Sequence, residues 1–273
     1  MSNTKLATKA VLTAPIHAWE QGVVVPAQDQ LANEVPIEIS YQGVAHVVML
    51  ATPLHVRELA LGFSVTEGLV RSLSEIKDIV ITESADSIAV NLTVTAERFA
   101  QILTRQRHLS GRTGCGLCGA ASLADAIRHP TPIEQSWQLE PEWVQAALRE
   151  FSSYQPLNQH TGSIHAAAWV QGPAGIACAF EDVGRHNALD KLLGHLLQTQ
   201  ADLTRGFVLL SSRASFELVQ KSAMVGIPMV VAVSAPTALA VKTAQALGLT
   251  LVGFARAGRQ VVYSHPERLR VGS

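Results

Sequence analysis

The stretch FVLLSSRASFELVQKSAMVGIPMVVAVSAPTALAVKTAQALGLTLVGF, residues 207–254, decides the fold class of this 273-residue chain. Three apolar runs at 207–210, 229–233 and 249–254 have the length of buried strands, and the two segments between them carry apolar residues at helical spacing. Short links from strand to helix to strand require parallel strands joined by right-handed crossovers. The stretch therefore predicts an α/β fold with a parallel sheet and flanking helices.

Other elements are expected on either side of this stretch. Residues 1–30 show little periodicity and predict an irregular or extended lead-in. Gln42-Gly43 predicts a tight turn between two strands, and Thr52-Pro53 predicts the start of a helix that ends near Gly68. The remaining expected elements are strands at 79–81 and 88–94, a helix capped by Thr95, a helix at 141–151, a hairpin of 165–170 with 176–180, and a return strand at 259–263.

We divide the chain into an N-terminal α+β lobe at 1–108, a cysteine loop with its following segment at 109–130, and an α/β lobe at 131–273, packed as one compact unit. With 48% hydrophobic residues, the chain can bury a sizeable core. Its net charge of −1 does not favour nucleic acid or an anionic membrane as a partner. Charged residues make up only 16% of the chain, against about 25% in typical domains, which favours a homo-oligomer.

No apolar run approaches the roughly 18 residues that a membrane helix needs. The first 18 residues also lack the continuous apolar block of a signal peptide. We therefore expect a cytoplasmic protein, and cytoplasmic cysteines are kept reduced.

Two of the three cysteines lie in the glycine-rich segment Gly114-Cys115-Gly116-Leu117-Cys118-Gly119. A zinc site needs about four ligands, and the third cysteine, Cys178, stands alone in an apolar strand. A thioredoxin-like dithiol needs a strand-to-helix turn, which the predicted helix before the loop does not provide. A third interpretation is a nucleophilic cysteine that carries a group. Cations nearby in the sequence would lower its pKa: Arg105, Arg107, His108 and Arg112. The spacing alone leaves the three interpretations open.

A second polar motif, EDVGRHNALDK at 181–191, lies between a strand and a helix with a leucine stripe. Asn187 and Asp190 have the spacing of a helix-capping pair. The remaining polar residues of the motif are Asp182, Arg185 and His186. Their structural interpretation is an ion pair and a cap at the helix start. Their functional interpretation is a polar site that faces the cysteine loop. His160 and His165 flank a short polar segment and stay unassigned.

Three segments share one position, directly after a predicted parallel strand: Ser211-Ser212-Arg213, Ser234-Ala235-Pro236-Thr237 and Phe254-Ala255-Arg256-Ala257-Gly258-Arg259. Ligands of open α/β sheets bind at this edge, and two of the segments lead into helices, whose N-termini favour phosphate. The arginine side chains would supply bidentate donors. Together the segments predict an anionic ligand.

Six motifs together resemble the formate dehydrogenase accessory sulfurtransferases, the FdhD family, over residues 29–269. The motifs are LANEVP at 31–36, ELALGF at 58–63, GRTGCGLCG at 111–119, EDVGRHNALDK at 181–191, SSR at 211–213 and FARAGR at 254–259. The resemblance implies a mixed sheet flanked by helices, similar to the cytidine deaminase fold, in a cytoplasmic homodimer. A deaminase activity is not expected, because Cys115 follows Gly114 where zinc deaminases have proline.

The resemblance further implies a sulfurtransferase with a cysteine persulfide intermediate. Such a protein takes sulfur from a cysteine desulfurase and transfers it to the molybdenum or tungsten of the bis-guanine dinucleotide cofactor, which formate dehydrogenase needs. The persulfide carrier falls on Cys115, and Cys118 either shares the sulfur or releases it. The expected cofactor contacts, for which GDP is an analogue, are Phe254, Ala255, Arg256, Ala257, Gly258 and Arg259, with Arg213 and Thr237. No permanent metal is expected.

Two alternatives remain beside this interpretation. The first is a non-catalytic chaperone that binds the molybdenum cofactor for formate dehydrogenase, with the cysteines tuning affinity only. The second is a zinc-binding structural protein.

Overall fold

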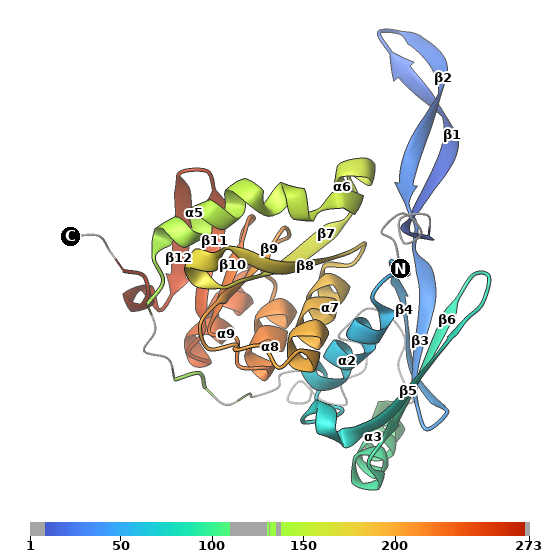
Figure 1. The fold of residues 1–273 in the computed structure, drawn as a ribbon, viewed down its shortest axis with the longest axis vertical. Helices are drawn as coiled ribbons and strands as arrows, with labels where there is room; N and C mark the ends of the chain where they lie inside the picture. Colours follow the sequence, from blue (N-terminus) through green and yellow to red (C-terminus); the bar gives the residue numbers. More distant parts are fainter. Residues whose placement is uncertain (1–8, 110–129, 131, 135–137, 271–273) are drawn as a thin grey trace.

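The computed structural model describes residues 9–109, 130, 132–134 and 138–270 of the chain. Its largest sheet has six strands in the spatial order β12-β11-β10-β9-β7-β8 (Figure 1). The parallel core predicted from the sequence is confirmed, because β10 pairs in parallel with both β9 and β11. Antiparallel neighbours extend it on both sides, so the sheet is mixed. The strands are β7 (His165–Val170), β8 (Ile176–Asp182), β9 (Phe207–Leu210), β10 (Met229–Ala232), β11 (Thr250–Arg256) and β12 (Arg259–Ser264).

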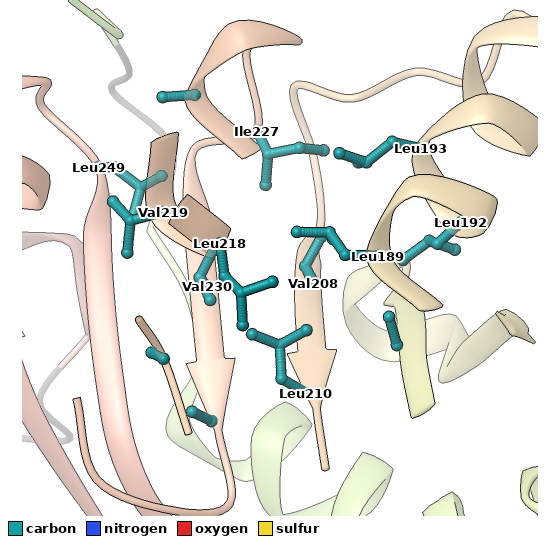
Figure 2. Packing of buried hydrophobic residues seen from close by; sticks show 14 of the residues in the cluster. Leu189, Leu192, Leu193, Val208, Leu210, Leu218, Val219, Ile227, Val230 and Leu249 are labelled. Carbon is teal, nitrogen blue, oxygen red and sulfur yellow. The ribbon is translucent and has the colours of Figure 1, made fainter. Parts of the chain in front are cut away.

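Helices cover both faces of this sheet because its strands are apolar on both faces. Val208 and Leu210 of β9 pack with one set of helices, and Phe207 and Leu209 pack on the opposite side. Figure 2 shows leucines of the first set directed at β9 and β10. The first set is α7 (Arg185–Gln198), α8 (Phe216–Met224) and α9 (Ala238–Ala246), and the opposite face carries α5 (Pro141–Glu150) with the 3₁₀ turn η2 (Phe151–Tyr154).

A separate four-stranded sheet, ordered β4-β3-β6-β5, lies beside the large one and has its own hydrophobic core (Figure 1). The Gln42-Gly43 turn between β3 and β4 is confirmed, with both residues at positive φ. The elements are β3 (Val35–Tyr41), β4 (Val44–Ala51), α2 (Val56–Thr66), η1 (Leu73–Glu75), β5 (Ile76–Glu83), β6 (Ile88–Val94) and α3 (Ala96–Leu109). Helix α2 packs against α7 and joins the two parts.

Two sequence predictions differ from the structure in this region. The lead-in, predicted to be irregular or extended, is extended, and it forms a long hairpin of β1 (Val11–Glu20) and β2 (Val23–Ala32) that was not predicted. Gln21 and Gly22 close it, and their φ values of 50° and 92° fit a type I′ turn. The hairpin lies exposed to solvent along most of its length, and β2 shows no regular alternation of buried and exposed residues.

The predicted helix start at Thr52-Pro53 lies too early, because α2 begins at Val56. Thr52 is fully buried and cross-links two distant segments instead of capping the helix. Its Oγ1 accepts a hydrogen bond from the Val183 amide at 3.1 Å, and its carbonyl oxygen accepts one from Lys191 Nζ at 3.0 Å.

The hairpin of β7 and β8 was predicted correctly and is joined by η3 (Gly172–Ala174). Two further short helical elements, α6 (Pro156–Thr161) and η4 (Pro266–Arg268), complete the fold. Within the residues that the structure describes, no helix is both long and apolar enough to cross a lipid bilayer.

Candidate functional site

Strands β8, β9, β10 and β11 all end at one edge of the large sheet, which we call the carboxyl edge. Two of the three segments predicted to bind an anion follow β9 and β10, and the third spans the last three residues of β11, the turn and the first residue of β12. Main-chain hydrogen bonds connect this part of the chain. Phe254 N donates to the Ser234 carbonyl at 3.1 Å, and Thr237 N donates to the Ala214 carbonyl at 3.0 Å. The structure therefore brings together the segments that the sequence placed at one edge.

Phe254, two residues before the end of β11, has an unusual backbone. Its φ is +48°, in the left-handed region, and the pairing of β11 with β12 shifts register between Gly253 and Arg256. A non-glycine residue in this region costs of order 1 kcal/mol or more, and such residues cluster at functional sites. The guanidinium carbon of Arg256 lies 6.0 Å from the centre of the Phe254 ring, at the limit of a cation–π contact.

The predicted contact residues differ in what they offer a ligand. The guanidinium-bearing residues Arg213, Arg256 and Arg259 are exposed, whereas Ala255 is fully buried and serves the fold. Thr237 is exposed, but its Oγ1 accepts a hydrogen bond from Ala240 N at 3.2 Å and caps α9. Exposed guanidinium groups beside the N-termini of α8 and α9 suit phosphate groups.

One residue that supports the edge was missed from the sequence. Gln145, on α5, accepts a hydrogen bond from Gly258 N at 2.8 Å and donates to Gln260 Oε1 at 3.2 Å, which fixes the turn between β11 and β12. Gly258 has a φ of +72°, which suits this turn. Gln145 lies 113 residues from Gly258 in the chain, so no local pattern could reveal the contact.

The predicted sulfur carriers Cys115 and Cys118 lie outside the described residues, as does Arg112. Of the cations predicted near them, Arg105 donates through Nη1 to the Glu67 carbonyl at 2.9 Å. The third cysteine, Cys178, lies half-buried in β8, where burial raises the pKa of its thiol to about 11. A thiol with that pKa is a poor nucleophile at neutral pH.

The 181–191 motif ends β8 and begins α7, and its acidic residues are structural. Asp182 and Lys191 form a fully buried ion pair, with the carboxylate 2.6 Å from Nζ. Asp182 also accepts hydrogen bonds from the backbone N–H groups of Thr52 at 3.1 Å and Gly184 at 2.8 Å. Burial lowers the pKa of Lys191, and the Asp182 carboxylate opposes this effect. The pair therefore ties the end of β8 to the segment before α2.

This arrangement changes the predicted roles of the motif. The ion pair expected at the helix start joins Asp182 to Lys191, not to Arg185 or His186. The expected capping pair of Asn187 and Asp190 is wrong, because Gly184 is the N-cap residue. Asn187 instead donates to the Leu50 carbonyl at 2.9 Å and to Asp182 Oδ1 at 3.0 Å.

Asp190 belongs to a second buried ion pair. Its carboxylate accepts a hydrogen bond from Lys221 Nζ at 2.7 Å and one from Thr66 Oγ1 at 2.7 Å. Glu67 Oε1 lies 3.0 Å from the same Nζ. Burial alone would lower the pKa of Lys221, but the two carboxylates raise it above its usual value. The network links α2, α7 and α8 behind the carboxyl edge.

The sequence of this chain matches a known protein family over most of its length. The model of the FdhD/NarQ family matches residues 32–270. The chain belongs to the FdhD/NarQ family. A relative from Cupriavidus necator, named sulfur carrier protein FdhD, is 46% identical over 258 residues, which cover 94% of this chain and 90% of the relative. A protein of the same name from Xanthomonas euvesicatoria pv. vesicatoria is 42% identical over 245 residues, covering 90% of this chain and 87% of the relative.

The fold of this FdhD/NarQ chain also matches a solved structure. The crystal structure of a candidate formate dehydrogenase accessory protein from Desulfotalea psychrophila superposes with a TM-score of 0.75 at 23% identity. The match covers 96% of this chain and 100% of that protein. The layered α/β architecture is therefore shared across most of both chains.

Proposed function

We propose that this FdhD/NarQ protein is a sulfur carrier, a sulfurtransferase that serves formate dehydrogenase. It accepts sulfur from the persulfide of a cysteine desulfurase and transfers it to the molybdenum (or tungsten) of the bis-guanine dinucleotide cofactor, which is its substrate. The observation that carries this proposal is the 46% identity, over 94% of the chain, to a relative named sulfur carrier protein FdhD.

The loading step is a thiol–disulfide exchange at Cys115. Its thiolate attacks the outer sulfur of the donor persulfide, a new sulfur–sulfur bond forms on Cys115, and the donor cysteine leaves as a thiolate. No external oxidant or reductant is needed, because the outer sulfur changes only its partner. Cys118 then shares the sulfur or releases it. In the release route its thiolate attacks Cys115 Sγ, hydrosulfide leaves for the metal, and a cellular thiol later reduces the disulfide that remains.

The carboxyl edge is the proposed seat of the cofactor. Phe254, Arg256, Arg259 and Arg213 offer an aromatic ring and three exposed guanidinium groups to the guanine nucleotide ends. The main-chain bonds between the ends of β9, β10 and β11 fix this set of groups on rigid elements. We expect GDP to bind here as an analogue of the cofactor.

The family resemblance also supports three finer assignments that we propose with this function: a cytidine-deaminase-like large sheet, a cytoplasmic location and a homodimer. The β1–β2 hairpin favours the homodimer. Trp19 and Val24, a directly opposed pair on the hairpin, are 71% and 60% exposed. An isolated two-stranded hairpin is marginally stable in water, so a second protomer would stabilise it.

Mass spectrometry of the intact protein tests the sulfur-carrier function. After incubation with a cysteine desulfurase and free cysteine, we expect an adduct of about 32 Da, one sulfur atom, that a reductant removes. Cys115→Ala should lose both the adduct and the maturation of formate dehydrogenase, while Cys178→Ala, the matched control, keeps both. Full maturation by Cys115→Ala would exclude the sulfur carrier. GDP binding without any adduct on the wild-type protein would support the cofactor chaperone instead.

A further inference from the structure

A group of basic side chains lies at the opposite end of the carboxyl edge from Arg256. His165 is the first residue of β7 and pairs in register with Asp182, the last residue of β8. Arg185 and His186 begin α7 directly after Gly184, its N-cap. We call His165, Arg185 and His186 the His–Arg cluster. It adjoins the end of β9, because Ser211 N donates to the Ala166 carbonyl at 3.0 Å and Ser211 Oγ accepts from Ala166 N at 2.8 Å.

Two donor nitrogen atoms of this cluster are unpaired in the described structure. Arg185 Nε and His186 Nε2 are both inaccessible to solvent and have no hydrogen-bond partner among the described residues. The nearest carboxylate oxygen that the structure gives for His186 is Glu217 Oε2, at 3.5 Å, which is too long for a good hydrogen bond. Buried donors are normally satisfied, so these two nitrogen atoms are available to an acceptor that a ligand brings.

The carboxylates beside the cluster are already occupied. Asp182 is paired with Lys191 and accepts hydrogen bonds from Gly184 and Asn187. Glu217 accepts a hydrogen bond from Ser215 Oγ at 2.7 Å. The Arg185 guanidinium therefore keeps its positive charge without an ion pair among the described residues.

The electrostatics agree with this geometry. Burial and the Arg185 guanidinium lower the pKa of His165, with Asp182 opposing them. Burial and Arg185 also lower the pKa of His186, as does Lys221, while Glu217 on α8 raises it. A bound anion would counter the repulsion from Arg185 and raise the pKa of both histidines.

We propose that the His–Arg cluster is a second anion site on the carboxyl edge, which binds a phosphate group. The α7 N-terminus supports this ligand, because its side-chain cap is absent and its first backbone N–H groups point beyond the helix. The site lies three to four strand spacings from β11, or about 14–19 Å, so it is distinct from Arg256 and Arg259. Arg213, which follows β9, lies between the two sites along the carboxyl edge.

The role assigned to this site rests on the proposed function. The nucleotide arms of the cofactor carry phosphate groups, and a cofactor with two arms presents them at two separated places. The Phe254–Arg259 segment would bind one nucleotide arm, and the His–Arg cluster would bind a phosphate group of the other arm. Free inorganic phosphates share the same chemistry, so the experiment below separates the two sources.

The test uses the full chain. Sodium pyrophosphate, GDP and guanosine are each titrated into the protein in a calorimeter, which measures their dissociation constants. Arg185→Gln should weaken pyrophosphate binding at least about tenfold, since hydrogen bonds to charged groups contribute roughly 1.5–3 kcal/mol. Arg185→Lys should keep part of the affinity. The matched control is Arg205→Gln. Arg205 is exposed and precedes β9, at the end of the strands opposite the carboxyl edge, so its substitution should leave pyrophosphate affinity unchanged.

NMR titration of the imidazole protons gives a second readout. Adding pyrophosphate should move the titration midpoints of His165 and His186 to higher pH in the wild-type protein and not in Arg185→Gln. Midpoints that stay in place, or pyrophosphate affinity equal in Arg185→Gln and wild type, would overturn the anion site.

Comparison with Arg256→Gln separates this inference from the proposed function. If GDP binds and only Arg256→Gln weakens it, the cofactor seat stands and the cluster's part in it is refuted. If pyrophosphate binds through Arg185 but GDP binds no better than pyrophosphate, the anion site stands for inorganic phosphates and the proposed cofactor seat fails. Binding of guanosine as tight as that of GDP would contradict both, because neither site would then recognise phosphate.

Discussion

Gly62 of α2 and Gly194 of α7 bring the backbones of the two helices into direct contact. A Cβ atom at Gly62 would lie 1.9 Å from the Asp190 carbonyl oxygen, and one at Gly194 would lie 2.0 Å from the Glu58 carbonyl oxygen. Neither oxygen can move without shifting its helix. This crossing joins the core of the four-stranded sheet to the helical layer behind the carboxyl edge.

Gly62→Ala and Gly194→Ala should each destabilise the protein by at least about 2 kcal/mol, because the added methyl group must push the helices apart. Urea denaturation followed by circular dichroism measures the effect. Gly226→Ala is the control: a Cβ there meets nothing within 4 Å, and only its positive φ of 79° opposes the change. A Gly62→Ala protein as stable as Gly226→Ala would show that the crossing is looser than described.

The buried pair of Asp182 and Lys191 predicts a strong dependence on both partners. Lys191→Met should cost about 3–5 kcal/mol of unfolding free energy, because it leaves a carboxylate buried without its cation. Adding Asp182→Asn should recover part of this loss. Lys9→Met, which breaks the exposed pair of Lys9 with Glu83, should cost less than about 1 kcal/mol. A double variant less stable than Lys191→Met would show that the hydrogen bonds that Asp182 accepts from Thr52, Gly184 and Asn187 outweigh the relief of its buried charge.

The left-handed backbone of Phe254 predicts opposite effects on stability and binding. Phe254→Gly removes the steric cost of a φ of +48° and should raise the unfolding free energy by up to about 1 kcal/mol. The same change removes the ring beside Arg256 and should weaken GDP binding severalfold in a calorimetric titration. Loss of stability together with unchanged GDP affinity would assign Phe254 to packing instead of to the ligand.

Histidine burial predicts a loss of stability in mild acid. Burial lowers the pKa of His46 and of His55, so the unfolded chain takes up protons first as the pH falls below about 6.5. The stability that these neutral histidines contribute is complete above that pH and is lost below it. His55→Asn, which tolerates the left-handed φ of 54°, should therefore lose less stability between pH 7.5 and 5.5 than the wild type. Equal losses of stability in the variant and the wild type would show that His55 has the same pKa in the folded and unfolded states.

The exposed hairpin predicts an effect on self-association. Trp19→Gln with Val24→Gln removes an opposed apolar pair and should raise the dimer dissociation constant at least about tenfold if a second protomer covers it. Analytical ultracentrifugation measures the constant, and Gln28→Ala on the same exposed hairpin is the control. A wild-type chain that sediments as a monomer at micromolar concentration would refute the homodimer.

Local sequence patterns predicted the strands and helices whose buried residues recur at the spacing of the element. The apolar runs of β9, β10 and β11 and the glycine signals between them placed three loops on one edge, and the structure connects those loops by main-chain bonds. The β1–β2 hairpin escaped prediction because its strands lie in solvent, although Gln21-Gly22 repeats the dipeptide that correctly marked the Gln42-Gly43 turn.

Tertiary contacts explain what the sequence could not reveal. Lys221 contacts Asp190 across 31 residues and Thr66 across 155, so its partners depend on how α2, α7 and α8 assemble. Asn187 has the spacing of a capping residue, but its amide reaches Leu50 because the two parts of the chain pack there. Local propensity describes neither contact.

The order of elements along the chain also fixes an order of events during synthesis. The ribosome delivers Cys115 and Cys118 well before β11 and β12, which carry Arg256 and Arg259. A growing chain thus possesses the thiols of the proposed carrier while the proposed seat of the cofactor is still untranslated. A chain that ends before β11 lacks Arg256 and Arg259, so the proposed seat becomes complete only when the last two strands of the large sheet have been made.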